Sequence, residues 1–247
     1  MASRRPLAGL RIVLTRPPEP RETLAKDLSR LGARVFRVPT IRIAPPKTWK
    51  PFDAALGKEW DWVLFTSAHG ADAYFDRLKA ARRDGKAPRL GAVGPATADA
   101  VRRRGGRVAL VASEHRGEGL ARDLGKVRGK RILLAVADKA QPALPKLLTK
   151  GGAAVRVLTA YRTLAVPIAR AGLKTLANAD VIIFTSSSTA ENLHKAMGRS
   201  AFRSLFMQVH AASIGPVTSE TLRALGVKPS VEADPYTTKG LVAALLK

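Results

Sequence analysis

The feature that most restricts how this chain can fold is a set of landmarks that recurs after about 120 residues. Glycines and two Phe-Thr-Ser triplets pair along the chain at offsets of 120, 120, 119, 121 and 121 residues. The paired landmarks are Gly9 and Gly129, Gly32 and Gly152, Phe65 and Phe184, Gly94 and Gly215, and Gly119 and Gly240. A nearly constant offset over most of a 247-residue chain predicts two homologous halves, each about 120 residues long.

Each half alternates strand-like and helix-like patterns. Apolar runs rich in β-branched residues are typical of buried strands, and between them apolar side chains recur at helical spacing, as at Leu24, Leu28 and Leu31. The strand-like runs are residues 11–15, 33–38, 62–67, 90–94 and 107–112 in the first half, and 131–136, 153–158, 181–186, 211–215 and 229–233 in the second. This order predicts an α/β protein of two open parallel-sheet units with helices on both faces of each sheet.

Two Gly-Pro-x-Thr turns indicate where a ligand would bind. Glycine tolerates unusual dihedral angles and proline fixes φ, so the threonine falls in the first turn of a helix. In parallel α/β sheets ligands bind beyond the carboxyl ends of the strands, where helix N-termini attract anions. The turns hold Gly94 with Thr97 and Gly215 with Thr218, and Thr66-Ser67 and Thr185-Ser186 follow neighbouring strands. The pattern predicts binding positions for a ligand with several anionic groups. The alternative interpretation is that both are ordinary strand-to-helix turns with a capping hydroxyl.

The chain is strongly basic, with 43 Lys and Arg against 19 Asp and Glu and a formal net charge of +24. A nucleic-acid partner, a small polyanionic substrate and a solvated surface are each consistent with this excess. The basic runs at residues 82–86, 102–107 and 126–131 fall at the ends of helical patterns, where cations complement the helix dipole. Because these runs lack interleaved aromatic residues for base stacking, we assign most of the charge to the surface and expect no nucleic-acid partner.

Several kinds of chemistry lack their usual residues. The absence of cysteine excludes disulfides and thiolate sites, and no typical metal-site spacing occurs among His69, His115, His194 and His210. The sequence has no Gly-rich dinucleotide or phosphate loop and no Gly-x-Ser-x-Gly turn. No apolar run approaches the ~20 residues that span a bilayer, and the N-terminal residues lack a signal-peptide pattern. We therefore expect a cytoplasmic protein that binds a polyanion and uses no metal, cofactor or membrane.

Six short motifs occur in order along the chain. They are Leu-Thr-Arg-Pro at 14–17, Phe-Thr-Ser at 65–67 and again at 184–186, Val-Gly-Pro-Ala-Thr-Ala at 93–98, Thr-Ala-Tyr-Arg-Thr at 159–163 and Ile-Gly-Pro-Val-Thr-Ser at 214–219. In this order and spacing the chain resembles the uroporphyrinogen-III synthase family over nearly its whole length. The resemblance implies two Rossmann-like or flavodoxin-like domains joined by a two-stranded linker, with the active site in the cleft between them.

The family pattern also implies that the domains are not the two halves of the sequence. The first β-α-β piece would pair with the last part of the chain. One domain is then expected from residues 1–37 and 165–247, and the other from residues 44–158. The linkers would be residues 37–43 and 158–164, which occupy equivalent places in the two halves.

The activity implied by the resemblance is that of a cofactor-free hydro-lyase of tetrapyrrole and heme biosynthesis. Its substrate would be hydroxymethylbilane, a linear tetrapyrrole with eight carboxylates. The substrate loses its terminal hydroxyl as water, inverts its last ring and closes to uroporphyrinogen III. Such catalysis relies on positioning the substrate. The alternatives are a two-lobed polyanion-binding module without catalysis and, less favoured, a basic nucleic-acid-binding protein.

The family also implies roles for individual residues. Tyr161 matches the linker tyrosine and is the candidate for proton transfer to the leaving hydroxyl, and packing of its ring between the domains is the alternative role. Many members have arginine after the strand equivalent to residues 131–136, where this chain has Asp138 and Lys139. We expect a monomer whose partner is the substrate. The residues expected to receive substrate carboxylates are Arg16, Thr66, Ser67, Gly94, Thr97, Thr185, Ser186, Gly215 and Thr218.

Overall fold

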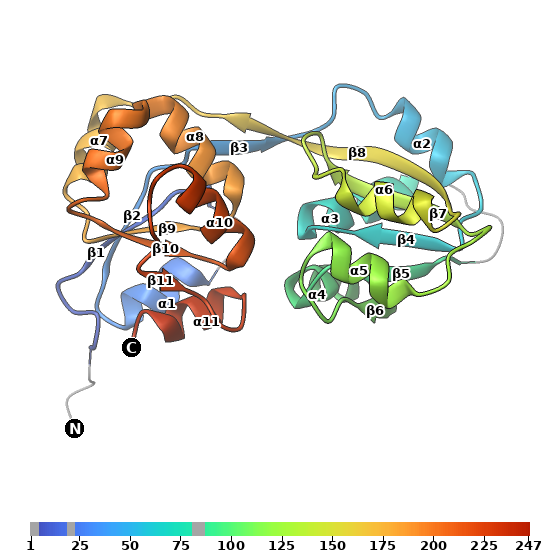
Figure 1. The fold of residues 1–247 in the computed structure, drawn as a ribbon, viewed down its shortest axis with the longest axis horizontal. Helices are drawn as coiled ribbons and strands as arrows, with labels where there is room; N and C mark the ends of the chain where they lie inside the picture. The colour runs from blue at the N-terminus through green and yellow to red at the C-terminus, as the bar shows by residue number, and fades with distance from the viewer. Residues whose placement is uncertain (1–4, 19–22, 81–86) are drawn as a thin grey trace. The chain divides into compact units, whose positions relative to one another are not determined.

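The chain forms two compact units in a computed structural model that describes residues 5–18, 23–80 and 87–247 (Figure 1). Unit 1 comprises Met1–Arg42 and Leu164–Lys247, and unit 2 comprises Ile43–Thr163. The basic run at residues 82–86 lies outside the described residues. Among the described residues no helix is long and apolar enough to cross a membrane.

Unit 1 contains a five-stranded sheet with the order β11-β10-β9-β1-β2, in which every neighbouring pair is parallel. Its strands are β1 (Arg11–Leu14), β2 (Arg34–Arg37), β9 (Val181–Phe184), β10 (His210–Ser213) and β11 (Val231–Glu232). Its helices in the described part of the chain are α1 (Leu24–Arg30), α7 (Arg170–Ala177), α8 (Ser187–Met197), α9 (Arg199–Leu205), α10 (Pro216–Ala224) and α11 (Thr238–Ala244). The first two strands of the chain therefore share a sheet with the last three.

Unit 2 contains a six-stranded sheet with the order β3-β8-β7-β4-β5-β6, in which β8, β7, β4, β5 and β6 run parallel. Its strands are β3 (Ile41–Ala44), β4 (Trp62–Phe65), β5 (Arg89–Ala92), β6 (Val108–Val111), β7 (Arg131–Ala137) and β8 (Ala154–Ala165). Its helices in the described part are α2 (Lys50–Leu56), α3 (Ala68–Ala80), α4 (Pro95–Arg103), α5 (Gly117–Leu124) and α6 (Ala143–Lys150). The chain enters unit 2 within β3 and leaves it within β8.

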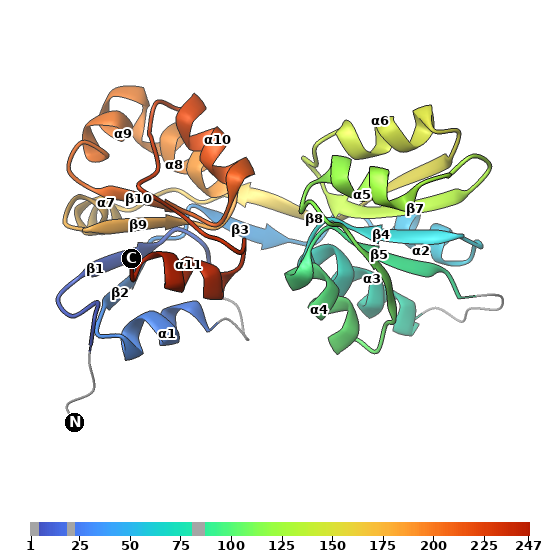
Figure 2. The same cartoon turned by 60° about the horizontal axis from the view of Figure 1, so that its bottom comes forward.

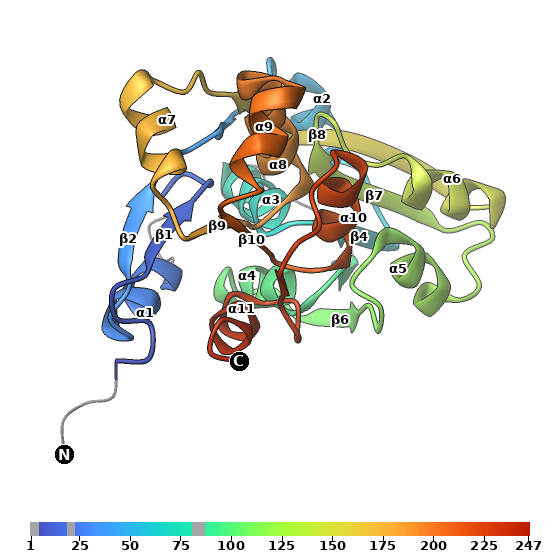
Figure 3. The same cartoon turned by 60° about the vertical axis from the view of Figure 1, so that its left-hand side comes forward.

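Alternating side chains give each sheet two apolar faces, because successive residues of a strand point to opposite sides. In unit 1, Val13 packs with residues of α7, α8, α9 and α10, whereas Ile12 and Leu14 pack with α1 and α11 (Figure 3). In unit 2, Phe65 packs with α2, α3 and α4, whereas Leu64 packs with α5 and α6 (Figure 2). Each unit is thus a sheet between two layers of helices.

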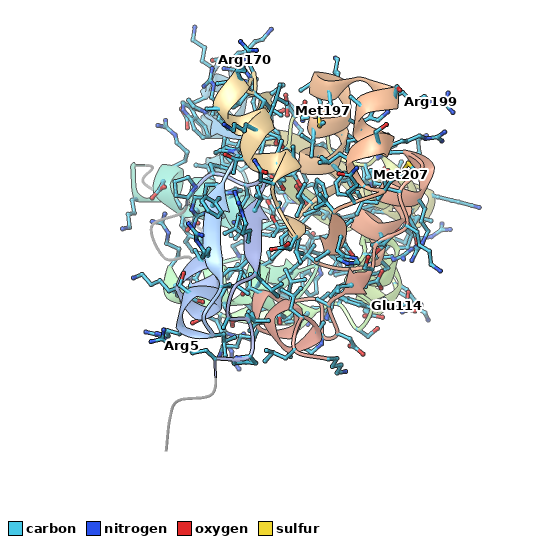
Figure 4. All side chains as sticks on the ribbon, turned by 90° about the vertical axis from the view of Figure 1, so that its left-hand side faces the viewer. Arg5, Glu114, Arg170, Met197, Arg199 and Met207 are labelled. Carbon is cyan, nitrogen blue, oxygen red and sulfur yellow. The ribbon has the colours of Figure 1, made fainter. Side chains whose placement is uncertain are left out.

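These findings confirm the prediction of an α/β protein with two parallel-sheet units. The domain boundaries and the internal repeat stay predictions. The strand predicted at residues 153–158 is longer than expected, because β8 continues through the predicted linker to Ala165. Charged side chains lie largely at the surface, and the exposed Arg5, Arg170 and Arg199 extend outward from unit 1 (Figure 4).

Candidate active site

The residues predicted to bind a ligand lie where parallel strands end, and each unit has its own such edge. The edge of unit 1, here called the unit 1 rim, carries Arg16 after β1, Thr185 and Ser186 after β9, and Gly215 and Thr218 after β10. The edge of unit 2, the unit 2 rim, carries Thr66 and Ser67 after β4, and Gly94 and Thr97 after β5. Strands β1, β9 and β10 are neighbours, as are β4 and β5, so the fold gathers the predicted residues within each unit.

The two Gly-Pro turns begin helices in the same way. The carbonyl oxygen of Gly94 accepts the N–H of Ala98 at 3.0 Å at the start of α4, and Pro95 stands in the first turn. The carbonyl oxygen of Gly215 accepts the N–H of Ser219 at 3.0 Å at the start of α10. Within the described residues no side chain caps either helix. First-turn N–H groups lack intrahelical partners and the dipole favours anions there, so both turns can receive a carboxylate.

The threonines of these turns do not face solvent. Thr97 is 6% exposed and Thr218 is 4% exposed. The residues at the surface of the turns are Ala96 and Val217. A carboxylate would therefore meet the backbone of the turn before it met a threonine hydroxyl, and direct contacts from Thr97 and Thr218 stay predictions.

An aromatic ring lies against the glycine of each turn. A Cβ atom at Gly94 would lie 3.4 Å from Cγ of His115, and a Cβ atom at Gly215 would lie 3.1 Å from Cγ of Tyr236. His115 follows β6 and Tyr236 follows β11, the strands next to β5 and β10. Neither ring is among the residues predicted from the sequence for the site. Their separation of 121 residues equals that of Gly94 and Gly215, so the repeat was the signal that could have identified them.

Hydroxyl groups cluster at the start of α8 on the unit 1 rim. The Oγ atoms of Ser186 and Ser188 lie 3.0 Å apart. Thr221 of α10 donates a hydrogen bond of 2.7 Å to Ser187, whose Oγ lies 3.3 Å from the carbonyl oxygen of Val217. Only Ser186 was predicted for the site. The neighbouring hydroxyls extend the set of possible hydrogen-bond donors to a carboxylate.

Arg16 is half-buried directly after β1. The residue before it, Thr15, is fully buried, and its hydroxyl donates to the carbonyl oxygen of Ile183 at 2.7 Å. The carbonyl oxygen of Thr15 in turn accepts the N–H of Thr40 at 3.0 Å. These bonds fix the backbone from which Arg16 extends, and so they hold a cation at the unit 1 rim.

Tyr161 lies on β8 and is half-buried in unit 2. Its ring meets the ring of His69 with a centroid distance of 5.2 Å and an interplanar angle of 62°. His69 stands in the first turn of α3, and Ser67, just before that helix, accepts the N–H of Gly70 at 3.1 Å. A Cβ atom at Gly70 would overlap the carbonyl oxygen of Ala135, so glycine lets α3 approach β7 closely here.

The surroundings of Tyr161 keep its hydroxyl protonated. Burial raises the pKa of Tyr161 above its ordinary value, a hydrogen bond with the Ser67 side chain acts in the opposite direction, and the negative charge of Asp138 raises the pKa again. The raised pKa means that the phenol carries its proton throughout the neutral pH range. Tyr161 therefore has a proton to donate at neutral pH, and the raised pKa makes it a weaker acid than an exposed tyrosine.

Acidic and imidazole side chains can act as ligands for a metal ion. Within the residues that the structure describes, no group of three His, Asp or Glu side chains is placed to hold an ion. Among the described residues, the groups that can exchange a proton or bind an anion include the phenol of Tyr161 and the imidazole of His69 in unit 2, the hydroxyls of both rims, and the starts of α4, α8 and α10.

Comparison with known proteins gives a consistent result. The family model described as uroporphyrinogen-III synthase HemD matches residues 22–243. The uroporphyrinogen-III synthase of Synechococcus elongatus is 31% identical, over 97% of this chain and 96% of that protein. A crystal structure of a mutant uroporphyrinogen III synthase from Thermus thermophilus aligns with a TM-score of 0.72 at 22% identity, covering 96% of this chain and 97% of the other. The Helicobacter pylori uroporphyrinogen-III synthetase aligns with a TM-score of 0.62 at 17% identity, over 96% and 98% of the chains, and these two structures support the fold alone.

Proposed function

Because the chain belongs to the uroporphyrinogen-III synthase family, a family of hydro-lyases, we propose that the residues described above close hydroxymethylbilane to uroporphyrinogen III. The terminal C–O bond of the substrate breaks and the hydroxyl leaves as water. The last ring is attacked at its substituted carbon, passes through a spiro intermediate and closes the macrocycle in inverted orientation. The enzyme must supply a proton to the leaving group and a conformation that excludes closure without inversion.

The observation that carries this proposal is the placement of Tyr161 in one cluster with Ser67 and His69. The phenol O–H donates its proton to the departing hydroxyl, which leaves as water. Closure of the macrocycle releases a proton from the ring carbon that forms the new bond, and this proton restores the phenol. Ser67 supports the short-lived phenolate with a hydrogen bond, which is the direction of its effect on the pKa of Tyr161.

The rims supply contacts for carboxylates. Arg16 offers a cation on the unit 1 rim, and hydroxyls of Thr185 and Ser186 offer hydrogen-bond donors beside it. Thr66 and Ser67 play the same part on the unit 2 rim. The turns at Gly94 with Thr97 and at Gly215 with Thr218 contribute backbone N–H groups at helix N-termini. These contacts fix the side chains of the substrate and so select the conformation in which the terminal ring inverts.

The test is an analysis of product isomers from hydroxymethylbilane. Unaided closure gives the uninverted type I isomer. With the protein present at catalytic concentration, hydroxymethylbilane should instead close mainly to type III. A protein that binds the substrate but leaves type I as the product would instead be a polyanion-binding module. Binding to duplex DNA with a steep salt dependence, without isomer control, would favour a nucleic-acid-binding protein.

We further propose that the enzyme works as a cytoplasmic monomer, since each chain carries both rims. Sedimentation of the active protein tests this point. A turnover number per chain that rises with protein concentration would contradict it.

A further inference from the structure

The strand that carries Tyr161 is irregular at that residue. Along the pairing of β7 with β8, Val136 is opposite Thr159, whereas Ala137 is opposite Tyr161. One step on β7 therefore corresponds to two steps on β8, and Ala160 is the additional residue of a β-bulge. Bulges of this kind change the direction in which the following side chain points.

The bulge explains why Tyr161 reaches the face of the sheet that packs against α3. In a regular strand Tyr161 would point away from the face that Ala160 occupies. Leu158 and Ala160 are buried in the core cluster that includes residues of α3, and Tyr161 packs against that same cluster. Without the bulge, the ring would leave His69 and turn to the opposite face.

Asp138 holds the chain directly after the bulge. Its backbone N–H donates to the carbonyl oxygen of Tyr161 at 3.0 Å, and its side-chain Oδ1 accepts the N–H of Thr163 at 3.1 Å. These two bonds lie on either side of Arg162, whose Nε donates to the carbonyl oxygen of Pro45 at 2.9 Å. β8 is thus held on both sides at this position, and one aspartate supplies both bonds on the β7 side.

We propose that Asp138 is a positioning residue for the closure reaction: by clamping β8 after the bulge, it keeps the Tyr161 hydroxyl beside Ser67 and the ring of His69. The proposal rests on the role of Tyr161 in the proposed function. A carboxylate can accept the Thr163 N–H, which the side chain of the neighbouring Lys139, a donor only, could not do.

The charge of Asp138 acts on Tyr161 separately from its hydrogen bond to Thr163. The groups that face Tyr161 are His69 from α3, Ser67 from the end of β4, and Asp138 from the end of β7. The guanidinium of Arg162 is bound to Pro45, and Lys139 is exposed. Among these groups Asp138 is the anion, and its charge raises the pKa of the phenol and so opposes loss of the proton; the hydrogen bond to Thr163, rather than the charge, carries the positioning role.

Three variants separate the clamp from general stability. Asp138→Ala removes the side-chain hydrogen bond and the charge, whereas Asp138→Asn keeps an oxygen acceptor for Thr163 and removes only the charge. Asp61→Ala is the matched control, because Asp61 makes the same double contact at the other end of β7. Its N–H donates to the carbonyl oxygen of Arg131 at 2.9 Å, and its Oδ2 accepts the N–H of Arg131 at 2.7 Å.

We expect Asp138→Ala to lower kcat about 10²-fold with little change in KM, the size expected when a catalytic group is misplaced by ~1 Å. Asp138→Asn should recover most of this loss, and Asp61→Ala should leave kcat unchanged. The double variant Asp138→Ala with Tyr161→Phe should be no slower than Tyr161→Phe alone, because Asp138 acts through that hydroxyl. Additive losses in the double variant, or an equal loss of kcat in Asp61→Ala, would overturn the proposal.

A second measurement does not depend on activity. The alkaline absorbance titration of Tyr161 is taken as the difference between a protein with Tyr161 and the same protein with Tyr161→Phe. This titration should lie at lower pH in the Asp138→Asn background than in the wild-type background. An unshifted titration would overturn the electrostatic part of the proposal. If instead Tyr161→Phe retained full turnover while the titration shifted as expected, the proposed function of Tyr161 would fail and the placement of its ring by Asp138 would stand.

Discussion

The ring of His69 lies with its edge against the ring of Tyr161, with 5.2 Å between centroids. This contact connects the first turn of α3, which begins at the unit 2 rim, to the bulged part of β8. His69 is an aromatic packing partner of the phenol on the side of α3. Changes at His69 therefore separate the position of the phenol from its chemistry.

We expect His69→Ala to lower kcat roughly 2- to 12-fold, since an edge-on aromatic pair contributes about 0.5–1.5 kcal/mol to the order of the ring. His69→Phe keeps an aromatic edge and should retain near wild-type turnover. The measurement is steady-state turnover of hydroxymethylbilane at neutral pH. A loss in His69→Phe as large as that in His69→Ala would show that the imidazole itself takes part in proton transfer.

Alanine at the two turn glycines should have unequal effects. The backbone of both residues is extended and accepts a side chain. A Cβ atom at Gly215 would lie 3.1 Å from the Tyr236 ring, which is tight, whereas a Cβ atom at Gly94 would lie 3.4 Å from the His115 ring, which is ordinary contact. Gly215→Ala must displace the exposed Tyr236 ring, so it should weaken binding of uroporphyrinogen III several-fold with little change in melting temperature. Gly94→Ala is the control and should bind normally. Equal affinities for the two variants would mean that the Tyr236 ring does not line the site.

A buried hydroxyl on the unit 1 rim should matter for stability. Thr40 is fully buried, and its Oγ1 lies 3.0 Å from the carbonyl oxygen of Thr189 and 3.4 Å from that of Thr15. Thr40→Val keeps the shape but removes the buried hydroxyl and its hydrogen bonds, so urea unfolding should show a loss of about 0.5–1.5 kcal/mol. The partly exposed Thr175, whose hydroxyl donates to the carbonyl oxygen of Ala171 at 2.9 Å, is the control, and Thr175→Val should change stability by about 0.5 kcal/mol or less. Equal losses would remove the buried hydrogen bond as the cause.

The raised pKa of Tyr161 predicts a pH dependence of stability. A folded-state pKa above the unfolded value means that the stabilising contribution is fully present below the unfolded pKa of about 10 and is lost as pH rises through the folded value. The difference in unfolding free energy between wild type and Tyr161→Phe should stay constant from about pH 7 to about pH 9 and decrease at higher pH. An increase of that difference above pH 10 would indicate a lowered pKa instead.

Salt should affect substrate capture more than chemistry. A net charge of +24 attracts a substrate with eight carboxylates, and ions screen this attraction over about 10 Å at 0.1 M salt. We expect KM to rise with NaCl concentration while kcat stays nearly constant. A KM that is independent of salt would assign the positive charge to other purposes, such as solubility.

The sequence predicts the framework of the site because local patterns determine it. Buried strands appear as β-branched runs, and Gly-Pro pairs at 94 and 215 locate the helix starts at the carboxyl ends of strands. The Gly-Pro-x-Thr pattern by itself does not show which side of the first helical turn the threonine occupies. Thr97 and Thr218, which stand in the first turn as predicted, are buried, and their direct contact with a ligand stays a prediction.

The cluster around Tyr161 is less accessible to prediction from sequence. The bulge at Ala160 depends on how β8 pairs with β7, and the segment Thr-Ala-Tyr-Arg-Thr contains no glycine or proline that would indicate an irregularity. The sequence does not predict a positioning role for Asp138, because its hydrogen bond with the N–H of Thr163 becomes visible only in the folded structure. His69 lies close to Ser67 in sequence, but only the packing of α3 against β8 brings its ring to the tyrosine.

The most direct test of the account is a single-turnover measurement on Tyr161→Phe with hydroxymethylbilane, in which the rate and the isomer ratio are read from the same sample. The ring and its packing remain in this variant, so substrate binding should change little. If Tyr161 is the general acid, the rate should fall by about 10² to 10⁴ and type I isomer should accumulate through unaided closure. A near-normal rate with type III as the only product would contradict this role and would leave catalysis to the backbone donors and the bound conformation of the substrate.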